Sequence, residues 1–173
     1  MTPAADLEKA ALVGLGANME KPSGMIREAV RRLNGASGLR LLAVSSVYLT
    51  EPQGGPAGQN WFHNAVAFFD SRLSPAELMK LLLSTEAEMG RRRLVPNGPR
   101  VIDLDFLAQG ILVLDEPPHL ILPHPRMERR SFVLAPLAEL APGWRHPVSG
   151  RTASELLAAL PPEGQGFKKL KEL

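Results

Sequence analysis

The chain contains no cysteine, which excludes disulfides, zinc–thiolate sites and thiol nucleophiles. Aromatic residues are few, at 5% of 173 positions, and only one of them is tyrosine. No apolar run approaches the roughly 18 residues that a transmembrane helix needs. The N-terminal segment MTPAADLEKA also lacks the basic and apolar parts of a secretory signal. We therefore expect a soluble cytoplasmic protein with no membrane partner.

Excess charge is also small, because the formal net charge is only +2. That value gives no reason to expect nucleic-acid binding. The placement of arginine is more informative: seven of the 14 arginines lie between Arg91 and Arg130, and no lysine does. The guanidinium fork fits phosphate oxygens, whereas lysine is a mobile point charge. This clustering indicates recognition of an anion.

With 45% hydrophobic residues, residues 1–173 are long enough to form one domain with a substantial core. Two helix starts are clear, because Ser74-Pro75-Ala76-Glu77 and Thr152-Ala153-Ser154-Glu155 both have the pattern of a capping box. Periodicity and turn residues predict strands at 12–15, 39–49, 61–69 and 100–107, and helices at 23–33, 75–89, 131–140 and after Thr152. The order β-α-β, β-α-β predicts an α+β fold, a ferredoxin-like α/β sandwich with an antiparallel-rich sheet, helices on one face and loops on the other.

The segment EAEMGRRRLVPNGPRVI runs directly into Asp103-Leu104-Asp105. Alternate side chains of a strand share a face, so Asp103 and Asp105 are expected to face a cleft while Ile102, Leu104 and Phe106 face the core. Two unpaired carboxylates would repel each other, and a cation such as Mg²⁺ would relieve that repulsion. The alternative is a solvated strand edge, which the flanking arginines argue against.

Two basic groups accompany this strand. Arg91, Arg92, Arg93 and Arg100 precede it, and His124-Pro125-Arg126 follows it together with Arg129 and Arg130. Both groups could contact phosphate oxygens, and a histidine held between prolines could stabilise a leaving group. The alternative is a set of solvated charges near helix ends.

A third set of residues could bind a flat heterocycle. Asn64 offers both donors and an acceptor to a ring edge, and Phe62 and Phe132 could enclose a ring between them. Thr50 and Pro52 would complete this wall. Aromatic residues on strands usually pack in the core, so spacing alone gives this interpretation little weight.

These segments together resemble the 6-hydroxymethyl-7,8-dihydropterin pyrophosphokinase family of folate biosynthesis. The resemblance covers about residues 12–142, and its most specific strings are NGPRVIDLDFL and LPHPRMERRSFVLAPLAELAP. It implies a ferredoxin-like fold and transfer of pyrophosphate from ATP to the pterin hydroxymethyl group, with release of AMP. It also implies two Mg²⁺ ions and ATP as co-substrate. We expect no nucleic-acid partner and a monomer.

The resemblance assigns roles to individual positions. The metal ions would bind Asp103 and Asp105, which with Arg91 and Arg100 form the catalytic set. Mobile loops at 53–59 and 91–97 would close over both substrates. The substrate-contacting sets are Thr50, Pro52, Phe62, Asn64 and Phe132 for the pterin, and Glu86, Arg91, Arg93, Arg100, Ile102, His124 and Arg130 for ATP.

Two positions depart from the family pattern. Asn97 stands where the family often has tryptophan, so a lid contact by that ring is lost. Glu128 stands where a basic residue sometimes occurs, which removes one phosphate contact. Neither departure touches the metal pair.

Two other classes compete with this interpretation. A nucleotidyltransferase would also use paired carboxylates and Mg²⁺, but it would release pyrophosphate rather than AMP. A non-catalytic RNA-binding sandwich would need an open sheet face with few acids, and Asp103 and Asp105 argue against it.

Overall fold

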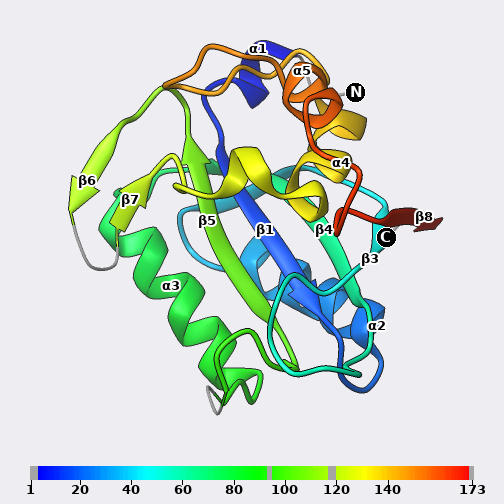
Figure 1. The fold of residues 1–173 in the computed structure, drawn as a ribbon. Coiled ribbons are helices and arrows are strands. Elements are labelled where there is room, and N and C mark those ends of the chain that lie inside the picture. Colours follow the sequence, from blue (N-terminus) through cyan, green and yellow to red (C-terminus); the bar gives the residue numbers. More distant parts are fainter. Residues whose placement is uncertain (1–3, 93–94, 117–119, 172–173) are drawn as a thin grey trace.

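The computed structural model describes residues 4–92, 95–116 and 120–171. Its main sheet has the strand order β5-β1-β4-β3-β8, with β2 also pairing with β4, and all of these pairings are antiparallel (Figure 1). The α+β class with a ferredoxin-like antiparallel sheet is thereby confirmed. The elements are α1 (Ala4–Leu7), β1 (Ala11–Ala17), α2 (Pro22–Asn34), β2 (Leu39–Val44), β3 (Val47–Thr50), β4 (Phe62–Ser71), α3 (Pro75–Glu88), β5 (Asp103–Gln109), β6 (Leu114–Glu116), β7 (Leu120–Leu122), the 3₁₀ turn η1 (Met127–Arg129), α4 (Ser131–Leu140), α5 (Ala153–Ala158) and β8 (Phe167–Lys171).

Helices α2 and α3 cover one face of the sheet. Their buried side chains, including Ile26, Leu33 and Leu82, pack against Val13 and Leu15 of β1. In α2 these residues recur at helical spacing, so a single stripe of the helix is buried. This face forms the larger of the two hydrophobic cores.

The prediction that helices cover only one face is wrong, because α4 covers the other and α5 packs against α4 (Figure 1). Val133 and Leu137 of α4 pack there against Leu12 and Phe68. The segment SFVLAPLAEL is apolar nearly all round and therefore requires burial. Strand β1 is buried along its whole length, as expected for a strand covered on both faces.

Local boundaries follow the sequence signals where those signals are specific. The capping boxes at Ser74 and Thr152 form as predicted, and each precedes a helix. The strand expected at 39–49 is interrupted at Ser45, whose hydroxyl group donates to the Ser46 carbonyl oxygen and accepts from the Val66 amide. Strand β8 was not predicted, since its FKKLK sequence carries three lysines.

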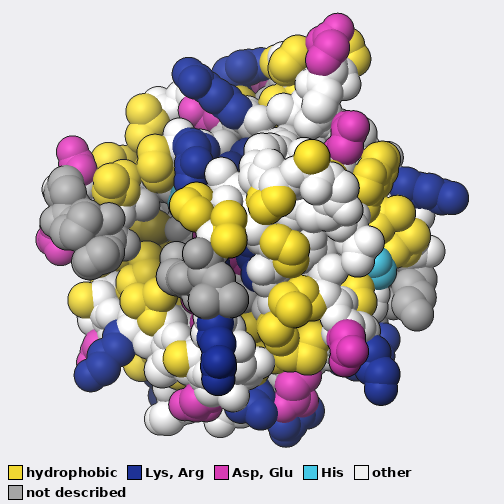
Figure 2. All heavy atoms as spheres, turned by 60° about the horizontal axis from the view of Figure 1, so that its bottom comes forward, with side chains coloured by type: hydrophobic (Ala, Val, Ile, Leu, Met, Phe, Trp, Pro, Cys, Tyr) yellow, Lys and Arg dark blue, Asp and Glu magenta, His cyan; other side chains and the backbone are white. Residues whose placement is uncertain are grey.

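Antiparallel pairing brings the end of β1 to the start of both neighbouring strands. Gly16 lies opposite Asn64 of β4 and Asp103 of β5. Figure 2 brings this end of the molecule forward, and hydrophobic side chains gather over the middle of it with charged side chains mainly around the rim. None of the helices in the described part of the chain combines the length and hydrophobicity that a bilayer crossing requires.

Candidate active site

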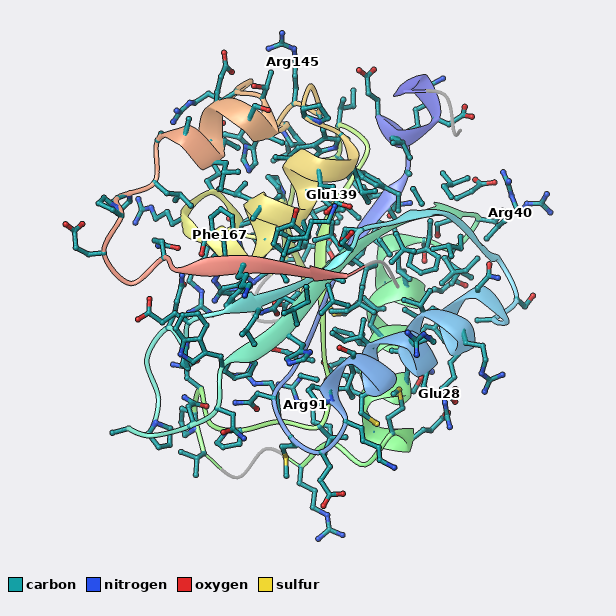
Figure 3. The ribbon with its side chains drawn as sticks, turned by 90° about the vertical axis from the view of Figure 1, so that its right-hand side faces the viewer. Glu28, Arg40, Arg91, Glu139, Arg145 and Phe167 are labelled. Atoms are coloured by element: carbon teal, nitrogen blue, oxygen red, sulfur yellow. The ribbon has the colours of Figure 1, made fainter. Side chains whose placement is uncertain are left out.

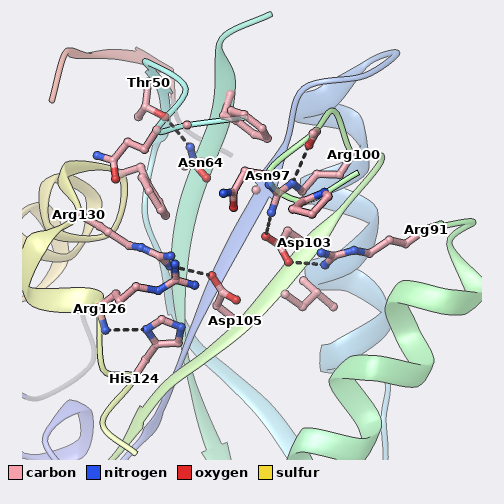
Figure 4. Close-up of a pocket in the computed structure, with 18 of the residues that line it drawn as sticks. Thr50, Asn64, Arg91, Asn97, Arg100, Asp103, Asp105, His124, Arg126 and Arg130 are labelled. Carbon is pink, nitrogen blue, oxygen red and sulfur yellow. Dashed lines mark hydrogen bonds and ion pairs between the residues drawn. The ribbon is translucent and has the colours of Figure 1, made fainter. Parts of the chain in front are cut away.

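A cleft of about 860 Å³ lies at this end of the sheet, large enough for a nucleotide with a second small molecule (Figure 4). Its walls come from β5, from loops on either side of it, from β4 and from the start of α4. The residues that line it include Gly16, Thr50, Glu51, Gln53, Phe62, Asn64, Met79, Leu83, Arg91, Arg92, Asn97, Arg100, Asp103, Asp105, Ile121, His124, Arg126, Arg129, Arg130 and Phe132.

Asp103 and Asp105 both face this cleft, as the strand period predicts. Leu104 and Phe106 are buried on the opposite face of β5. On β1 the position opposite Asp103 is Gly16, where an added Cβ would lie 2.6 Å from the Asn64 amide oxygen. The glycine therefore leaves room for Asn64 beside the two acids.

Asp103 is not unpaired, contrary to the expectation from sequence. One carboxylate oxygen accepts from Arg91 and the other from Arg100 (Figure 4). Burial raises the pKa of Asp103, but the charges of Arg91 and Arg100 outweigh that effect and hold it below its ordinary value. Each oxygen keeps a second lone pair, so this ionised carboxylate can still accept a further ligand.

The Glu86 carboxylate fixes the side chain of Arg91. Its Oε1 atom accepts from the Arg91 guanidinium group at 2.5 Å and from the Leu104 amide at 2.6 Å. Glu86 is buried in α3, and it does not line the cleft. The contacts of Glu86 therefore fix Arg91 and the start of β5, while Arg91 itself lines the cleft.

Asp105 has a different environment, although it lies on the same face of the same strand. Among the described residues its ion-pair partner is Arg130, with Nη1 at 3.7 Å from Oδ2. Burial, together with the charge of Asp103, raises the pKa of Asp105 to about 6. A divalent cation would favour the ionised form of this residue.

His124 faces Asp105 from the loop after β7 (Figure 4). Its Nδ1 atom accepts from the Arg126 amide at 3.2 Å, so the proton of the neutral ring resides on Nε2. Burial and the charges of Arg130 and Arg126 lower the pKa of His124 to about 4. The residue is a neutral Nε2–H donor at pH 7.

Four of the five residues predicted to form a heterocycle wall line the cleft: Thr50, Phe62, Asn64 and Phe132. Asn64 is buried, and its amide donates to the Thr50 hydroxyl group at 2.7 Å. An arginine guanidinium group lies over each aromatic ring. The Cζ atom of Arg100 is 5.2 Å from the centre of the Phe62 ring, and that of Arg130 is 5.1 Å from the centre of the Phe132 ring. Cation–π contacts thus connect the wall to the arginines.

Buried Asn18 joins the loops around the cleft. Its Oδ1 atom accepts from the Arg100 amide at 2.9 Å, and its Nδ2 atom donates to the Gln59 side chain and to the Asn60 carbonyl. Gln59 in turn donates to the Asn97 carbonyl oxygen at 3.1 Å. Asn97 has a left-handed backbone, with φ of 53°, so this residue contributes a carbonyl contact between loops where a family member would often present an indole ring.

Not every predicted residue lines the cleft. Pro52 is half-buried outside the lining, and Ile102 is fully buried in the core. Arg93 lies outside the described residues. Glu128 turns away and accepts from the Ser149 hydroxyl at 2.5 Å.

Several residues that line the cleft were absent from the predicted ATP and pterin sets, among them Gln53, Arg126 and Arg129. The basic cluster around His124 did include both arginines, so its composition was the available signal. Nothing in the local sequence distinguishes Gln53 from its loop neighbours.

The sequence model of the 7,8-dihydro-6-hydroxymethylpterin-pyrophosphokinase (HPPK) family matches residues 12–142. This chain belongs to that family. It is 45% identical over 152 residues to the 2-amino-4-hydroxy-6-hydroxymethyldihydropteridine pyrophosphokinase of Pseudomonas aeruginosa, covering 88% of this chain and 92% of the relative. The enzyme of the same name from Methylorubrum extorquens is 44% identical over 155 residues, covering 89% and 95%.

Solved structures support the fold. The wild-type HPPK-DHPS of Plasmodium falciparum superposes with a TM-score of 0.67 over 86% of this chain at 14% identity. The chain spans 44% of that longer protein, so the similarity concerns only part of it.

Proposed function

We propose that this HPPK-family chain transfers the pyrophosphoryl group of ATP to the hydroxymethyl oxygen of 6-hydroxymethyl-7,8-dihydropterin and releases AMP, a step of folate biosynthesis. One observation carries the assignment: a single cleft holds two carboxylates, several fixed arginines and a polar–aromatic wall. Acids with arginines suit a metal-bound polyphosphate, and the wall suits a flat heterocycle. Family membership and the names of the relatives support the same reaction.

The pterin would bind against Asn64, Phe62 and Phe132. The Asn64 amide lines the cleft and is oriented by its hydrogen bond to Thr50, so its remaining donor and acceptor would suit a ring edge. The two phenylalanines offer faces to the ring. At the far end, Met79, Leu83 and Ile121 form an apolar surface for the adenine base.

The donor set at β5 fits magnesium. Mg²⁺ prefers one or two carboxylates with phosphate and water oxygens, and the described residues contain no group of three or more acids or histidines that would form an all-protein cage. Asp103 and Asp105 would hold two ions between them and the triphosphate. Bound magnesium would neutralise the phosphate charge and polarise the transferred phosphorus.

The arginines supply the rest of the charge. The Arg91 guanidinium group is held by Glu86, and that of Arg100 by Asp103 and the Gly98 carbonyl oxygen, so both groups are oriented before a triphosphate arrives. Arg130 and the neutral Nε2–H of His124 face them across the acids. The negative charge of a triphosphate would raise the pKa of His124, which strengthens the donation to a phosphate oxygen.

Product analysis tests this function. Incubation with ATP, Mg²⁺ and the hydroxymethyl dihydropterin should yield AMP and a diphosphorylated pterin, and a chelator should abolish both products. Release of pyrophosphate with a nucleotidylated pterin would instead establish a nucleotidyltransferase. We also propose a monomer in the cytoplasm, and sedimentation would test the monomer.

A further inference from the structure

The side chain of Gln165 connects three segments around the cleft. Its Oε1 atom accepts from the Gln53 side chain at 2.7 Å and from the Ser131 amide at 2.9 Å. Its Nε2 atom donates to the Arg129 carbonyl oxygen at 3.1 Å. Gln165 lies outside the cleft and also outside residues 12–142, which the family match covers.

The orientation of this amide is fixed by its backbone partners. The Arg129 carbonyl requires a donor and the Ser131 amide requires an acceptor, so the two ends of the Gln165 amide cannot be exchanged. Gln53 must therefore be the donor in the third hydrogen bond. Within the described part of the chain, Gln165 is the hydrogen-bond partner of the Gln53 side chain.

The next residue ties the same segment to the same loop. The Glu51 amide donates to the Gly166 carbonyl at 3.0 Å, and the Gly166 amide donates to the Glu51 carboxylate at 3.3 Å. These contacts extend the pairing of β8 with β3, where Phe167 lies opposite Thr50. Figure 3 shows β8 along the edge of the sheet, with Phe167 at its start beside α4.

Two of the segments that Gln165 joins, the loop that carries Gln53 and the start of α4, line the proposed pterin site. Gln53 faces the cleft, and Ser131 is the first residue of α4, next to Phe132. Loss of the Gln165 side chain would remove the hydrogen-bonded link between Gln53 and the first turn of α4. The triphosphate side would keep its own supports, because Asn18 and Glu86 hold Arg100 and Arg91 independently.

We propose that Gln165 is a positioning residue for the pterin substrate. It sets the distance between the loop that carries Gln53 and the helix that carries Phe132, and so determines how tightly the ring is enclosed. The proposal rests on the proposed function. Gln165 is half-buried, so water can satisfy its partners after truncation and the fold does not depend on it.

Steady-state kinetics and thermal melts of Gln165→Ala test the proposal. The KM for the pterin should rise about fivefold, as expected for the loss of a neutral hydrogen bond, while kcat, the KM for ATP and Tm stay close to wild type. A matched control is Lys168→Ala in the adjoining strand β8, whose exposed side chain should be replaceable without effect. An unchanged KM for the pterin, or an equal rise in both KM values with a fall in Tm, would overturn the proposal.

A double-mutant cycle adds an independent check. Gln53→Ala combined with Gln165→Ala should raise the KM for the pterin no further than the more damaging single change, and additive effects would refute the coupling. Should Gln165→Ala fail to fold, Gln165→Glu retains the acceptor for Gln53 and Ser131 but loses the donor to the Arg129 carbonyl, so it should raise the KM for the pterin less than Gln53→Ala does; an equal or larger rise counts against the proposal. AMP formation by the wild type separates a failure of this proposal from a failure of the proposed function. If the wild type forms no AMP, the function itself is refuted.

Discussion

At the scale of single residues, the two aspartates of β5 show how environment separates identical side chains. Asp103 has both oxygens engaged by arginine, whereas Asp105 has one distant partner, at 3.7 Å. Their pKa values consequently move in opposite directions. Of the two carboxylates, Asp105 would be stabilised more by a bound cation. Its mutation therefore tests the proposed metal site more directly.

We predict that Asp105→Asn lowers kcat about a hundredfold or more and raises Tm at pH 7.5. The stability gain follows because an ionised Asp105 is penalised by burial and by Asp103. Each kcal/mol gained corresponds to about 2–4 °C at this chain length. Kinetics and calorimetry measure the two effects, and Asp70→Asn at an exposed site is a control. A loss of stability together with activity would contradict the predicted environment of Asp105.

The pH dependence of that stability gain has a definite sign. The folded pKa of Asp105, about 6, exceeds its ordinary 3.8, so between these values the folded chain binds the extra proton and stability falls as pH rises. The gain from Asp105→Asn should therefore be present above pH 6 and absent near pH 4. His124 acts oppositely, since its folded pKa of about 4 lies below 6.5. Calorimetry of wild type and Asp105→Asn between pH 4 and pH 7 would measure this gain. A gain that is larger at pH 4 than above pH 6 would contradict the prediction.

Gly16 gives a steric prediction. A methyl group at this position would lie 2.6 Å from Oδ1 of Asn64, so Gly16→Ala should displace the Asn64 amide and break its hydrogen bond to Thr50. Overpacking of this kind costs about 1–3 kcal/mol, and we expect a rise of about tenfold in the KM for the pterin. Gly14→Ala meets its nearest atom at 3.3 Å and should be milder. Equal effects of the two changes would argue against this role for Gly16.

At the scale of elements, the site depends on loops that Asn18 holds together. Asn18→Ala removes the acceptor for the Arg100 amide and the donor to the loop at 59–60. Loss of buried hydrogen bonds costs about 1–3 kcal/mol, so Tm should fall, and kcat/KM should fall for both substrates. Asn34→Ala, which affects a side-chain contact to Leu41 away from the cleft, is the control. Unchanged kinetics in Asn18→Ala would show that the loops are fixed by other contacts.

Elements with a strong local signal could be predicted from sequence. The capping box at Ser74 fixes the start of α3, and the alternation in β5 places both acids on one face. The position of α4 could not be predicted in this way, because an apolar helix can cover either face of a sheet. Strand β8 was missed because its pairing with β3 depends on a partner over 100 residues away.

At the scale of the whole molecule, the sequence predicts which residues gather but not how they pair. The arginines, the acids and the heterocycle wall do line one cleft. The pairing of Asp103 with Arg91 and Arg100 could not be predicted, since several arginines were available and only the folded loops select among them. The same limit applies to Gln53 and Gln165, which lie 112 residues apart. The expectation of one domain over residues 1–173 stays a prediction.

The central claim is that Asp103 and Asp105, surrounded by arginines, bind a magnesium-bound triphosphate in line with the pterin alcohol. The most direct test is a crystal structure with Mg²⁺ and a non-hydrolysable ATP analogue. The account predicts metal density between both carboxylates and the phosphates, with Arg91 or Arg100 turned from Asp103 toward phosphate oxygens. A nucleotide bound elsewhere, with Asp103 still paired to both arginines and no metal at Asp105, would contradict it.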